Sequence, residues 1–281
     1  MHQPPRPVVD PALLNATAAT RWANLGWWET DVQDYAIAAR ALATRVGEAA
    51  PLRAGDVVVD VACGYGDSLA HWVTAFGVAR VVGVEPDPAV SAAVRARIAA
   101  WGLADRITVV TATAETFDLA AHVPDATAIV CVDAAYHFRS RGAWLARIAE
   151  SASSGTRIGF SDLAVRDAAV SPQATMPPRT DAASAAPRAL RWGAARAGIP
   201  AANLWALHDI PDTMTAAGYA AVMVTECGGP ILDGFRAHAR RERGRWWHQP
   251  ARGGWRALAT AWLLGRVRPM LTMVCVGAQV R

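Results

Sequence analysis

The sequence predicts an α/β protein built on a doubly wound parallel sheet. Between residues 56 and 162, short β-branched runs that are apolar on both faces alternate with stretches of helical periodicity. Such strands belong to a parallel sheet with helices on both faces, because right-handed crossovers place the connecting helices there. The predicted strands are Val57–Val61, Val81–Val84, Ile107–Thr111, Ala128–Val132 and Arg157–Ser161. The predicted helices are Ser68–Phe76, Ala89–Trp101 and Ala143–Ala152.

Segments outside this alternation complete the organisation of the chain. Residues 10–50 are helical in pattern and rich in tryptophan, which predicts a helical lid over residues 1–50. Residues 51–281 are expected to form one domain with two insertions, an Ala/Pro/Ser-rich one at 164–208 and an Arg/Trp-rich one at 228–268. A glycine-terminated helix and two more strands are predicted at Ile210–Ala217, Tyr219–Glu226 and Pro269–Ala278.

Composition indicates a folded protein with an uneven charge distribution. Of 281 residues, 53% are hydrophobic and 19% are charged, which excludes a globally disordered chain. All 28 basic residues are arginine, and the formal net charge is +4. Residues 234–281 hold ten arginines and one acid, Glu242, so the preceding part of the chain is acidic. Four cysteines without CxxC spacing, no secretory signal and no apolar run of about 20 residues predict a reducing, cytoplasmic location.

The most informative segment is a glycine turn after the first predicted strand. Gly64 and Gly66 separate that strand from the next helix, and a turn of this kind lets a ligand approach the backbone closely. A dinucleotide site requires a third glycine, and Leu69 stands at its position. Asp60 and Asp67 flank the turn, where carboxylates repel a pyrophosphate and attract a cationic ligand. A nicotinamide-dependent oxidoreductase is therefore a disfavoured alternative.

An acid ends the second predicted strand. Glu85 stands at the carboxyl end of that strand, where a carboxylate can accept hydrogen bonds from both hydroxyls of a ribose. A solvated acid at a strand end is the alternative interpretation of this residue.

In their order, these motifs resemble those of class I S-adenosylmethionine-dependent methyltransferases, close to the sarcosine, tocopherol and antibiotic-tailoring kinds. The run from Asp60 to Gly66 resembles the D-x-G-x-G-x-G signature, with Ala62 in place of its first glycine, and Glu85 looks like the ribose-binding acid. Residues 113–115 are similar to the segment that lies along adenine, and residues 132–138 resemble the motif after the fourth strand. The resemblance implies a mostly parallel seven-stranded sheet, Rossmann-like, that ends in an antiparallel hairpin.

The resemblance also implies S-adenosylmethionine as the cofactor. Thr113 replaces an acid often found beside adenine, so a backbone contact is expected there. The residues expected to hold the cofactor are Asp60, Ala62, Gly64, Gly66, Glu85, Pro86, Thr113, Ala114, Glu115 and Asp133. The implied function is methyl transfer to O, N or C of a small, largely apolar or aromatic metabolite, in specialised metabolism. The alternative is a cyclase-type or non-transferring protein that binds the same cofactor.

Methyl transfer from a sulfonium is an in-line displacement that needs alignment and exclusion of water more than a covalent nucleophile. His137, just beyond the fourth predicted strand, is the first candidate for a general base, and Tyr136 is the second. Shaping the loop is the alternative role of His137. Asp162, at the end of the fifth predicted strand, either faces the acceptor or caps a helix. The other histidines lack metal-ligand spacing, so no metal is predicted.

The expected partner is a small-molecule acceptor beneath a lid made of the tryptophan-rich N-terminus and residues 164–208. Trp27, Trp28 and Tyr35 resemble the aromatic residues that close over the cofactor in this family, and packing of the first helix is an equal alternative. The Arg/Trp-rich stretch is interpreted first as a solvated helical face anchored by tryptophan. Peripheral contact of residues 235–268 with an anionic membrane is the second interpretation, and no nucleic acid is expected.

Overall fold

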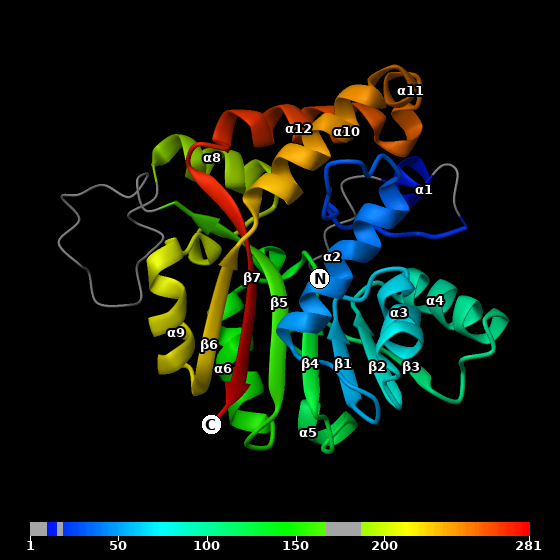
Figure 1. Cartoon of the computed structure of the whole chain (residues 1–281), viewed down its shortest axis with the longest axis vertical. Coiled ribbons are helices and arrows are strands. Elements are labelled where there is room, and N and C mark those ends of the chain that lie inside the picture. The colour runs from blue at the N-terminus through cyan, green and yellow to red at the C-terminus, as the bar shows by residue number, and fades with distance from the viewer. Residues whose placement is uncertain (1–9, 16–18, 167–186) are drawn as a thin grey trace.

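A seven-stranded sheet with strand order β3-β2-β1-β4-β5-β7-β6 forms the centre of the structure (Figure 1). The computed structural model describes residues 10–15, 19–166 and 187–281. Strands β1 to β5 pair in parallel, and β7 is antiparallel to both of its neighbours, β5 and β6. The expected doubly wound, mostly parallel sheet with a C-terminal antiparallel hairpin is confirmed. The strands are β1 Val57–Val61, β2 Arg80–Glu85, β3 Ile107–Thr111, β4 Ala128–Cys131, β5 Arg157–Val165, β6 Tyr219–Glu226 and β7 Leu271–Val280.

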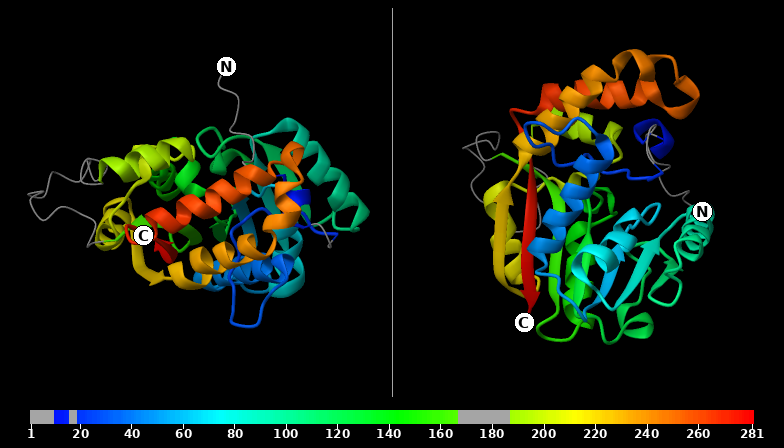
Figure 2. Two further views of the ribbon diagram at one scale, coloured as in Figure 1. Left: turned by 90° about the horizontal axis from the view of Figure 1, so that it is seen from above. Right: turned by 45° about the vertical axis from the view of Figure 1, so that its right-hand side comes forward.

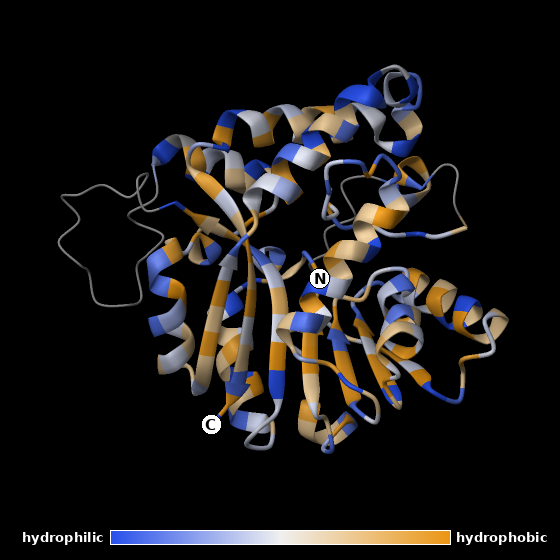
Figure 3. Ribbon diagram, in the orientation of Figure 1, coloured by the Kyte–Doolittle hydropathy of each residue, from blue (hydrophilic) through white to orange (hydrophobic). Residues whose placement is uncertain are grey.

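Helices cover both faces of the sheet, as the crossovers require. Helices α2, α3 and α4 pack on one face, where Trp72 and Val94 join the apolar cluster beneath them. Helices α5, α6 and α9 pack on the other face, with Trp144 and Met214 in the opposite cluster. The six helices are α2 Tyr35–Ala49, α3 Asp67–Phe76, α4 Pro88–Ala100, α5 Leu119–His122, α6 Arg141–Ser151 and α9 Ile210–Ala216. Figure 3 shows apolar residues along the strands, and the inner strands β1, β2, β4, β5 and β7 are buried on both faces. The edge strands β3 and β6 are partly exposed.

The N-terminal segment differs from its prediction. Helix α1 covers only Pro11–Leu14, and residues 19–34 are not helical before α2 begins at Tyr35. Tertiary hydrogen bonds explain the difference: the Trp27 amide donates to the Ala38 carbonyl at 2.8 Å, and the Trp28 amide donates to the Pro230 carbonyl at 3.0 Å. Residues 1–9 and 16–18 of the expected lid lie outside the described residues.

The described parts of the two insertions lie above the carboxyl ends of the parallel strands, together with α1 and residues 19–34 (Figures 1 and 2). Within the first insertion, residues 167–186 lie outside the described part. The remaining elements are α8 Arg188–Arg196 and short 3-10 turns at Ala135–His137, Ala201–Asn203, Leu207–Asp209 and Pro250–Arg252. The second insertion holds a π-helical turn at Gly229–Asp233, α10 Gly234–Arg241, α11 Arg243–Trp247 and α12 Gly254–Val267.

The second insertion is part of the lid, which the sequence did not predict. The Trp28 ring stacks on the His238 ring of α10 at 4.7 Å, and Tyr35 stacks on the same ring at 5.7 Å. Trp246 of α11 is fully buried in the same apolar cluster. The N-terminal segment and the second insertion are therefore packed together as one layer.

Candidate active site

Three loops meet where the strand order reverses between β1 and β4. The loops follow β1, β2 and β4; Gly64 lies in the first and Asp133 in the third, and Glu85 is the last residue of β2, directly before the second. In doubly wound sheets a ligand binds at the carboxyl edge of the strands at this reversal. The sheet therefore brings together the residues that the sequence had marked as a candidate site.

The turn after β1 is made of three residues with left-handed backbone angles. Ala62, Gly64 and Gly66 have φ of 63°, 53° and 83°. A Cβ on Gly66 would lie 2.7 Å from the Cγ1 of Val94, so α4 packs directly against the turn. A Cβ on Gly64 would meet no atom within 4 Å, so this glycine borders open space. Gly64 thus leaves its backbone accessible to a ligand.

Ala62→Gly is expected to raise the free energy of unfolding by about 0.5 kcal/mol. A left-handed alanine is strained by about 1–2 kcal/mol, and the greater freedom of glycine in the unfolded chain offsets part of that gain. Urea denaturation measures the change. Ala43→Gly, in the buried middle of α2, is the control and should lower stability by about 1 kcal/mol. Equal destabilisation by both substitutions would contradict the strain at Ala62.

Glu85 is a buried carboxylate that receives hydrogen bonds from backbone groups only. Its Oε1 accepts from the Asp87 amide at 3.0 Å, and the Gly64 backbone also hydrogen-bonds to it. Burial raises the pKa of Glu85 to about 7. Further hydroxyl donors would stabilise the charged form of a carboxyl that has so little contact with solvent. The ribose of a nucleoside offers two such hydroxyls.

The two acids that flank the turn have structural partners. The buried Asp60 accepts from the Trp72 indole at 2.7 Å, and burial raises its pKa to about 6. Asp67 makes a bidentate ion pair with Arg97, at 2.8 and 2.9 Å, and accepts from the Arg21 amide at 3.0 Å. The expectation that Asp67 presents a free charge to a cation is therefore wrong, because Arg97 neutralises it.

Asp133 connects the loop after β4 to the lid. Its carboxylate accepts from the Leu25 amide at 2.6 Å and from the Tyr136 hydroxyl at 2.9 Å. Its own amide donates to the Ser161 hydroxyl at 2.9 Å, and its backbone is left-handed with φ of 56°. Burial raises the pKa of Asp133 to about 7. A residue so fully bonded orients the loop and holds the N-terminal segment against the sheet.

The two candidate bases lie in the 3-10 turn after β4. Burial, and then the Asp133 carboxylate, raise the pKa of Tyr136 well above its ordinary value, so its hydroxyl stays protonated and donates to Asp133. His137 is part-buried, with Nδ1 3.3 Å from the carbonyl oxygen of Gly198. With Nδ1 as the donor in that bond, Nε2 is an unprotonated acceptor. Burial lowers the pKa of His137, so the ring is neutral at pH 7.

Residues 113–115 lie after β3, beside the end of β2 that carries Glu85. The side chain of Thr113 is engaged with Thr116, each accepting from the backbone amide of the other at 3.0 to 3.2 Å. Glu115 accepts from the Arg139 amide at 2.8 Å, so its carboxylate connects this loop to the turn after β4. Ala114 is buried and Pro86 is part-buried. Backbone groups of this segment, more than its side chains, are left to contact a ligand.

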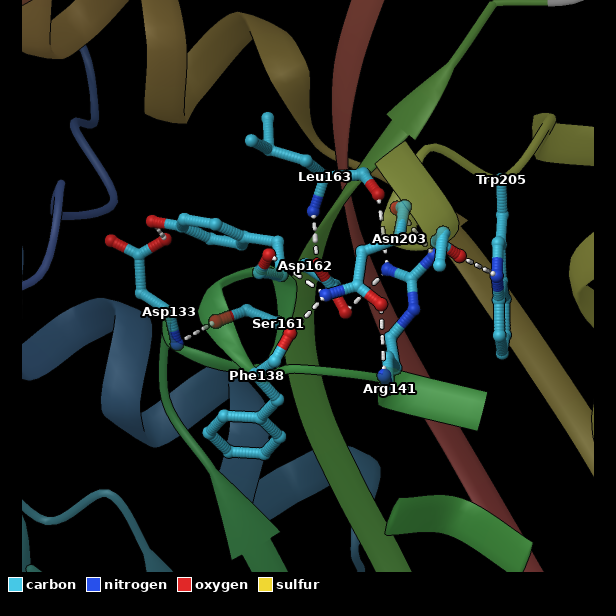
Figure 4. Close-up of polar contacts among 10 residues, drawn as sticks. Asp133, Phe138, Arg141, Ser161, Asp162, Leu163, Asn203 and Trp205 are labelled. Atoms are coloured by element: carbon cyan, nitrogen blue, oxygen red, sulfur yellow. Dashed lines mark hydrogen bonds and ion pairs between the residues drawn. The ribbon is translucent and has the colours of Figure 1, made fainter. Parts of the chain in front are cut away.

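A buried ion pair supports the turn after β4, and the sequence did not predict it (Figure 4). Arg141 is 1% exposed and its Nη1 lies 2.5 Å from Oδ2 of Asp162, which is 0% exposed. The guanidinium also lies 4.0 Å from the centroid of the Trp205 ring. Burial raises the pKa of Asp162, and Arg141 opposes that effect. Asp162 therefore neither faces an acceptor nor caps a helix.

Asn203 connects this ion pair to the candidate bases. Its amide nitrogen donates to the carbonyls of Tyr136 and Phe138, at 3.0 and 2.6 Å, and its side-chain oxygen accepts from the Arg141 amide at 2.8 Å (Figure 4). The Arg141 guanidinium donates to the Asn203 carbonyl at 3.0 Å. Asn203, which belongs to the first insertion, thus binds the turn after β4 at Tyr136 and Phe138 and the start of α6 at Arg141. Arg141, Asp162 and Asn203 are far apart in the sequence, and of these three residues only Asp162 had been singled out from the sequence.

Residues 58–155 match the family model described as a methyltransferase domain. They form a methyltransferase domain. No curated protein matches this sequence. The methyltransferase domain implies S-adenosylmethionine as the cofactor, and the resemblance drawn from the sequence motifs is confirmed.

Solved structures with the same fold extend over the whole chain. A mycolic acid cyclopropane synthase matches with a TM-score of 0.71 and 17% identity, over 96% of this chain and 98% of the other. The cyclase SpnF matches with a TM-score of 0.68 and 17% identity, over 95% and 92%. A putative sarcosine dimethylglycine methyltransferase from Galdieria sulphuraria matches with a TM-score of 0.68 and 14% identity, over 91% of both chains. These structures share the fold of this chain.

The residues of the methyltransferase domain fit the cofactor that the domain implies. Gly64 borders open space, Glu85 has a carboxylate for ribose hydroxyls, and no side chain caps α3 at Gly66, which leaves helix amides for a carboxylate. Desolvation raises the pKa values of the Asp60, Glu85 and Asp133 carboxyls, and a nearby cation, such as a sulfonium, would favour their charged forms. Among the described residues, no group of three His, Cys, Asp or Glu is arranged to hold a metal ion.

Proposed function

We propose that the chain is an S-adenosylmethionine-dependent methyltransferase that methylates an oxygen, nitrogen or carbon of a small, largely apolar or aromatic metabolite. The observation that supports it most is the placement of Glu85. Its buried carboxyl ends β2 beside the open backbone of Gly64, at the reversal of strand order, and both of its present donors are backbone amides. A role in specialised metabolism is part of the proposal.

Each part of the site has a distinct task in this proposal. When bound, the cofactor supplies a methyl group activated by the sulfonium charge. Glu85 accepts from the ribose, and the backbone of residues 62–66, with Pro86 and residues 113–115, encloses the rest of the nucleoside. Asp133 holds the lid closed through Leu25, which excludes water from the reacting atoms.

The acceptor is proposed to be apolar because of the side chains on the lid side of the β4 loop. Tyr136 belongs to a cluster of buried apolar residues drawn from α2, β5, α8, the π-helical turn and β7. Its other members include Leu42, Leu163, Leu190, Ile231, Leu232 and Met273. Among the residues that the structure describes, Arg141 is the buried arginine, and it is already paired with Asp162. An apolar molecule suits such surroundings better than a multiply charged one.

His137 is proposed as the general base for an acceptor that must lose a proton. His137→Gln is then expected to lower the rate of methyl transfer by about 10²-fold or more, with little change in cofactor affinity. His137→Asn is the matched control, because an Asn amide can keep the hydrogen bond to Gly198 while the Nε2 base is lost. The rate of formation of a labelled product is the measurement. Full activity of His137→Asn would assign the residue a purely structural role.

Calorimetry with S-adenosylmethionine and S-adenosylhomocysteine tests whether the chain binds the cofactor. If folded protein gives no heat of binding with either molecule, the proposal is overturned. The protein is next incubated with cofactor labelled at the methyl group and an extract of its host. A labelled small molecule and S-adenosylhomocysteine are the expected products.

The fold shared with SpnF supports a second candidate, a cyclase-type protein that keeps its cofactor intact. Binding without consumption of the cofactor, together with a change in another small molecule, would favour that candidate. No binding at all would exclude both.

A further inference from the structure

Four tryptophans of the lid are exposed to solvent. Trp192 of α8, Trp247 of α11, and Trp255 and Trp262 of α12 have exposed fractions of 62%, 66%, 53% and 64%. Exposure of one such ring is common, but four on adjoining helices require an explanation. We call these four residues the tryptophan face.

The four residues lie on adjoining elements. Trp255 and Trp262 are seven residues apart on α12, on the side opposite the buried Ala257 and Ala261. Gly254, next to Trp255, packs against the carbonyl of Trp246, the neighbour of Trp247. At the other end of α12, Leu263 lies against Gly193, the neighbour of Trp192, where a Cβ would be 3.7 Å away. Both contacts place the outer helices beside α12 (Figure 2).

Arginines accompany the rings. The guanidinium of Arg196 lies 4.6 Å from the ring of Trp192, Arg256 lies 5.3 Å from that of Trp255, and Arg266 lies 5.1 Å from that of Trp262. Among the described residues, none of these three arginines has an acid within ion-pair distance. Helix α8 contains three arginines and no acid, and residues 234–281 contain ten arginines and one acid.

From this combination we infer that the tryptophan face docks on an anionic lipid bilayer. Indole rings prefer the headgroup region, where the ring is apolar and its N–H is hydrated. Arginines at the same level attract the negative surface of a bilayer that contains anionic lipid. No helix in the described ranges is long and apolar enough to cross the membrane, so the contact is peripheral.

A lipid surface explains the pattern better than the other partners with which a basic face combines. Trp255 and Trp262 lie on the side of α12 opposite its buried residues, an arrangement that suits insertion of both rings into one lipid surface. A second copy of the chain would have to bring its own arginines against these arginines, and like charges would repel. The inference is independent of the proposed function, since lipid binding requires neither cofactor nor acceptor.

Co-sedimentation with vesicles tests the inference. The full chain is mixed with vesicles of phosphatidylcholine alone, or of phosphatidylcholine with phosphatidylglycerol, at low and high salt. We expect binding to the anionic vesicles that high salt weakens, and a blue shift of tryptophan fluorescence on binding. Trp255→Ser with Trp262→Ser is expected to weaken binding at least about tenfold.

Trp101→Ser is the matched control. Trp101, at the end of α4, is also exposed, and the Arg97 guanidinium lies 4.5 Å from its ring, but it is outside the tryptophan face. This variant should bind vesicles like the unmodified chain, and thermal melting checks that all variants are folded. Absence of vesicle binding, equal binding to neutral vesicles, or equal loss in the control would overturn the inference. So would a solution dimer, or an RNA complex, that buries Trp255 and Trp262 in place of lipid.

Discussion

Arg141→Leu is expected to lower the free energy of unfolding by about 3–5 kcal/mol. The substitution leaves the Asp162 carboxylate fully buried without its counter-ion, and removal of one partner of a buried pair leaves the penalty of burying the other. It also removes the guanidinium's hydrogen bonds to the carbonyls of Leu163 and Asn203 and its stacking on Trp205. Urea denaturation followed by circular dichroism measures the change.

The pH dependence distinguishes this cause from general disruption of the core. In the variant, burial without Arg141 raises the pKa of Asp162 further above its unfolded value, so the folded form takes up a proton. A carboxyl whose pKa is raised on folding stabilises the protein at low pH and loses that contribution as pH rises. Part of the lost stability should therefore return as pH falls from 7 to 5, relative to the unmodified protein.

A double-mutant cycle completes this test. Arg141→Leu combined with Asp162→Leu should be more stable than either single variant, because each single variant leaves one unpaired buried charge and the double variant leaves none. A loss below about 1 kcal/mol in the Arg141 variant, with no dependence on pH, would show that the ion pair does not stabilise the turn after β4.

Glu85→Ala is expected to weaken binding of S-adenosylmethionine by roughly 1–3 kcal/mol, or about 5-fold to 150-fold, measured by calorimetry. The proposed bonds from two ribose hydroxyls to this carboxylate are charge-assisted, and alanine supplies no acceptor. Glu85→Gln should lose less than alanine, since it keeps one carbonyl oxygen in place. An unchanged dissociation constant in the alanine variant would remove Glu85 from the site.

The affinity for the cofactor is also expected to depend on pH through Glu85. Burial raises the pKa of this carboxyl to about 7 in the free protein, and hydroxyl donors favour its charged form. Binding therefore releases a proton, and affinity should rise several-fold between pH 6 and pH 8. The Gln variant has no titratable group at this position, so its affinity should change less over the same range.

The strands and the candidate cofactor loop were predictable because their causes are local. Runs such as Val57–Val61 are apolar on both faces, a pattern that only a covered strand satisfies, and β1 and β3 begin and end where predicted. The left-handed turns after β1 are marked by glycine at two of three positions. At the third position, Ala62, no glycine is present, and only the structure shows that the backbone is left-handed there.

The predictions that were wrong or incomplete concern contacts between residues that are distant in the sequence. Asp67 was expected to attract a cation, and its actual partner, Arg97, comes from the next helix. Residues 19–34 were expected to be helical, yet Trp28 donates its amide to Pro230, some two hundred residues further along the chain. The second insertion was not expected to join the N-terminal segment, yet His238 stacks against the N-terminal aromatics. In each case a charge, an amide or a ring found a distant partner that no local pattern encodes.

The amino-acid order determines the parallel sheet, its covering helices and the turn that resembles a methyltransferase cofactor loop, because periodicity and backbone angles depend on neighbouring residues. Folding alone decides which carboxyls are neutralised, which are left buried without a cation, and which segments close over them. Those outcomes depend on desolvation and on pairing between groups that are remote in the chain. Asp60, Asp67, Glu85, Asp133 and Asp162 are all acids in the strands or in the segments that follow them, and only their tertiary surroundings assign them different roles.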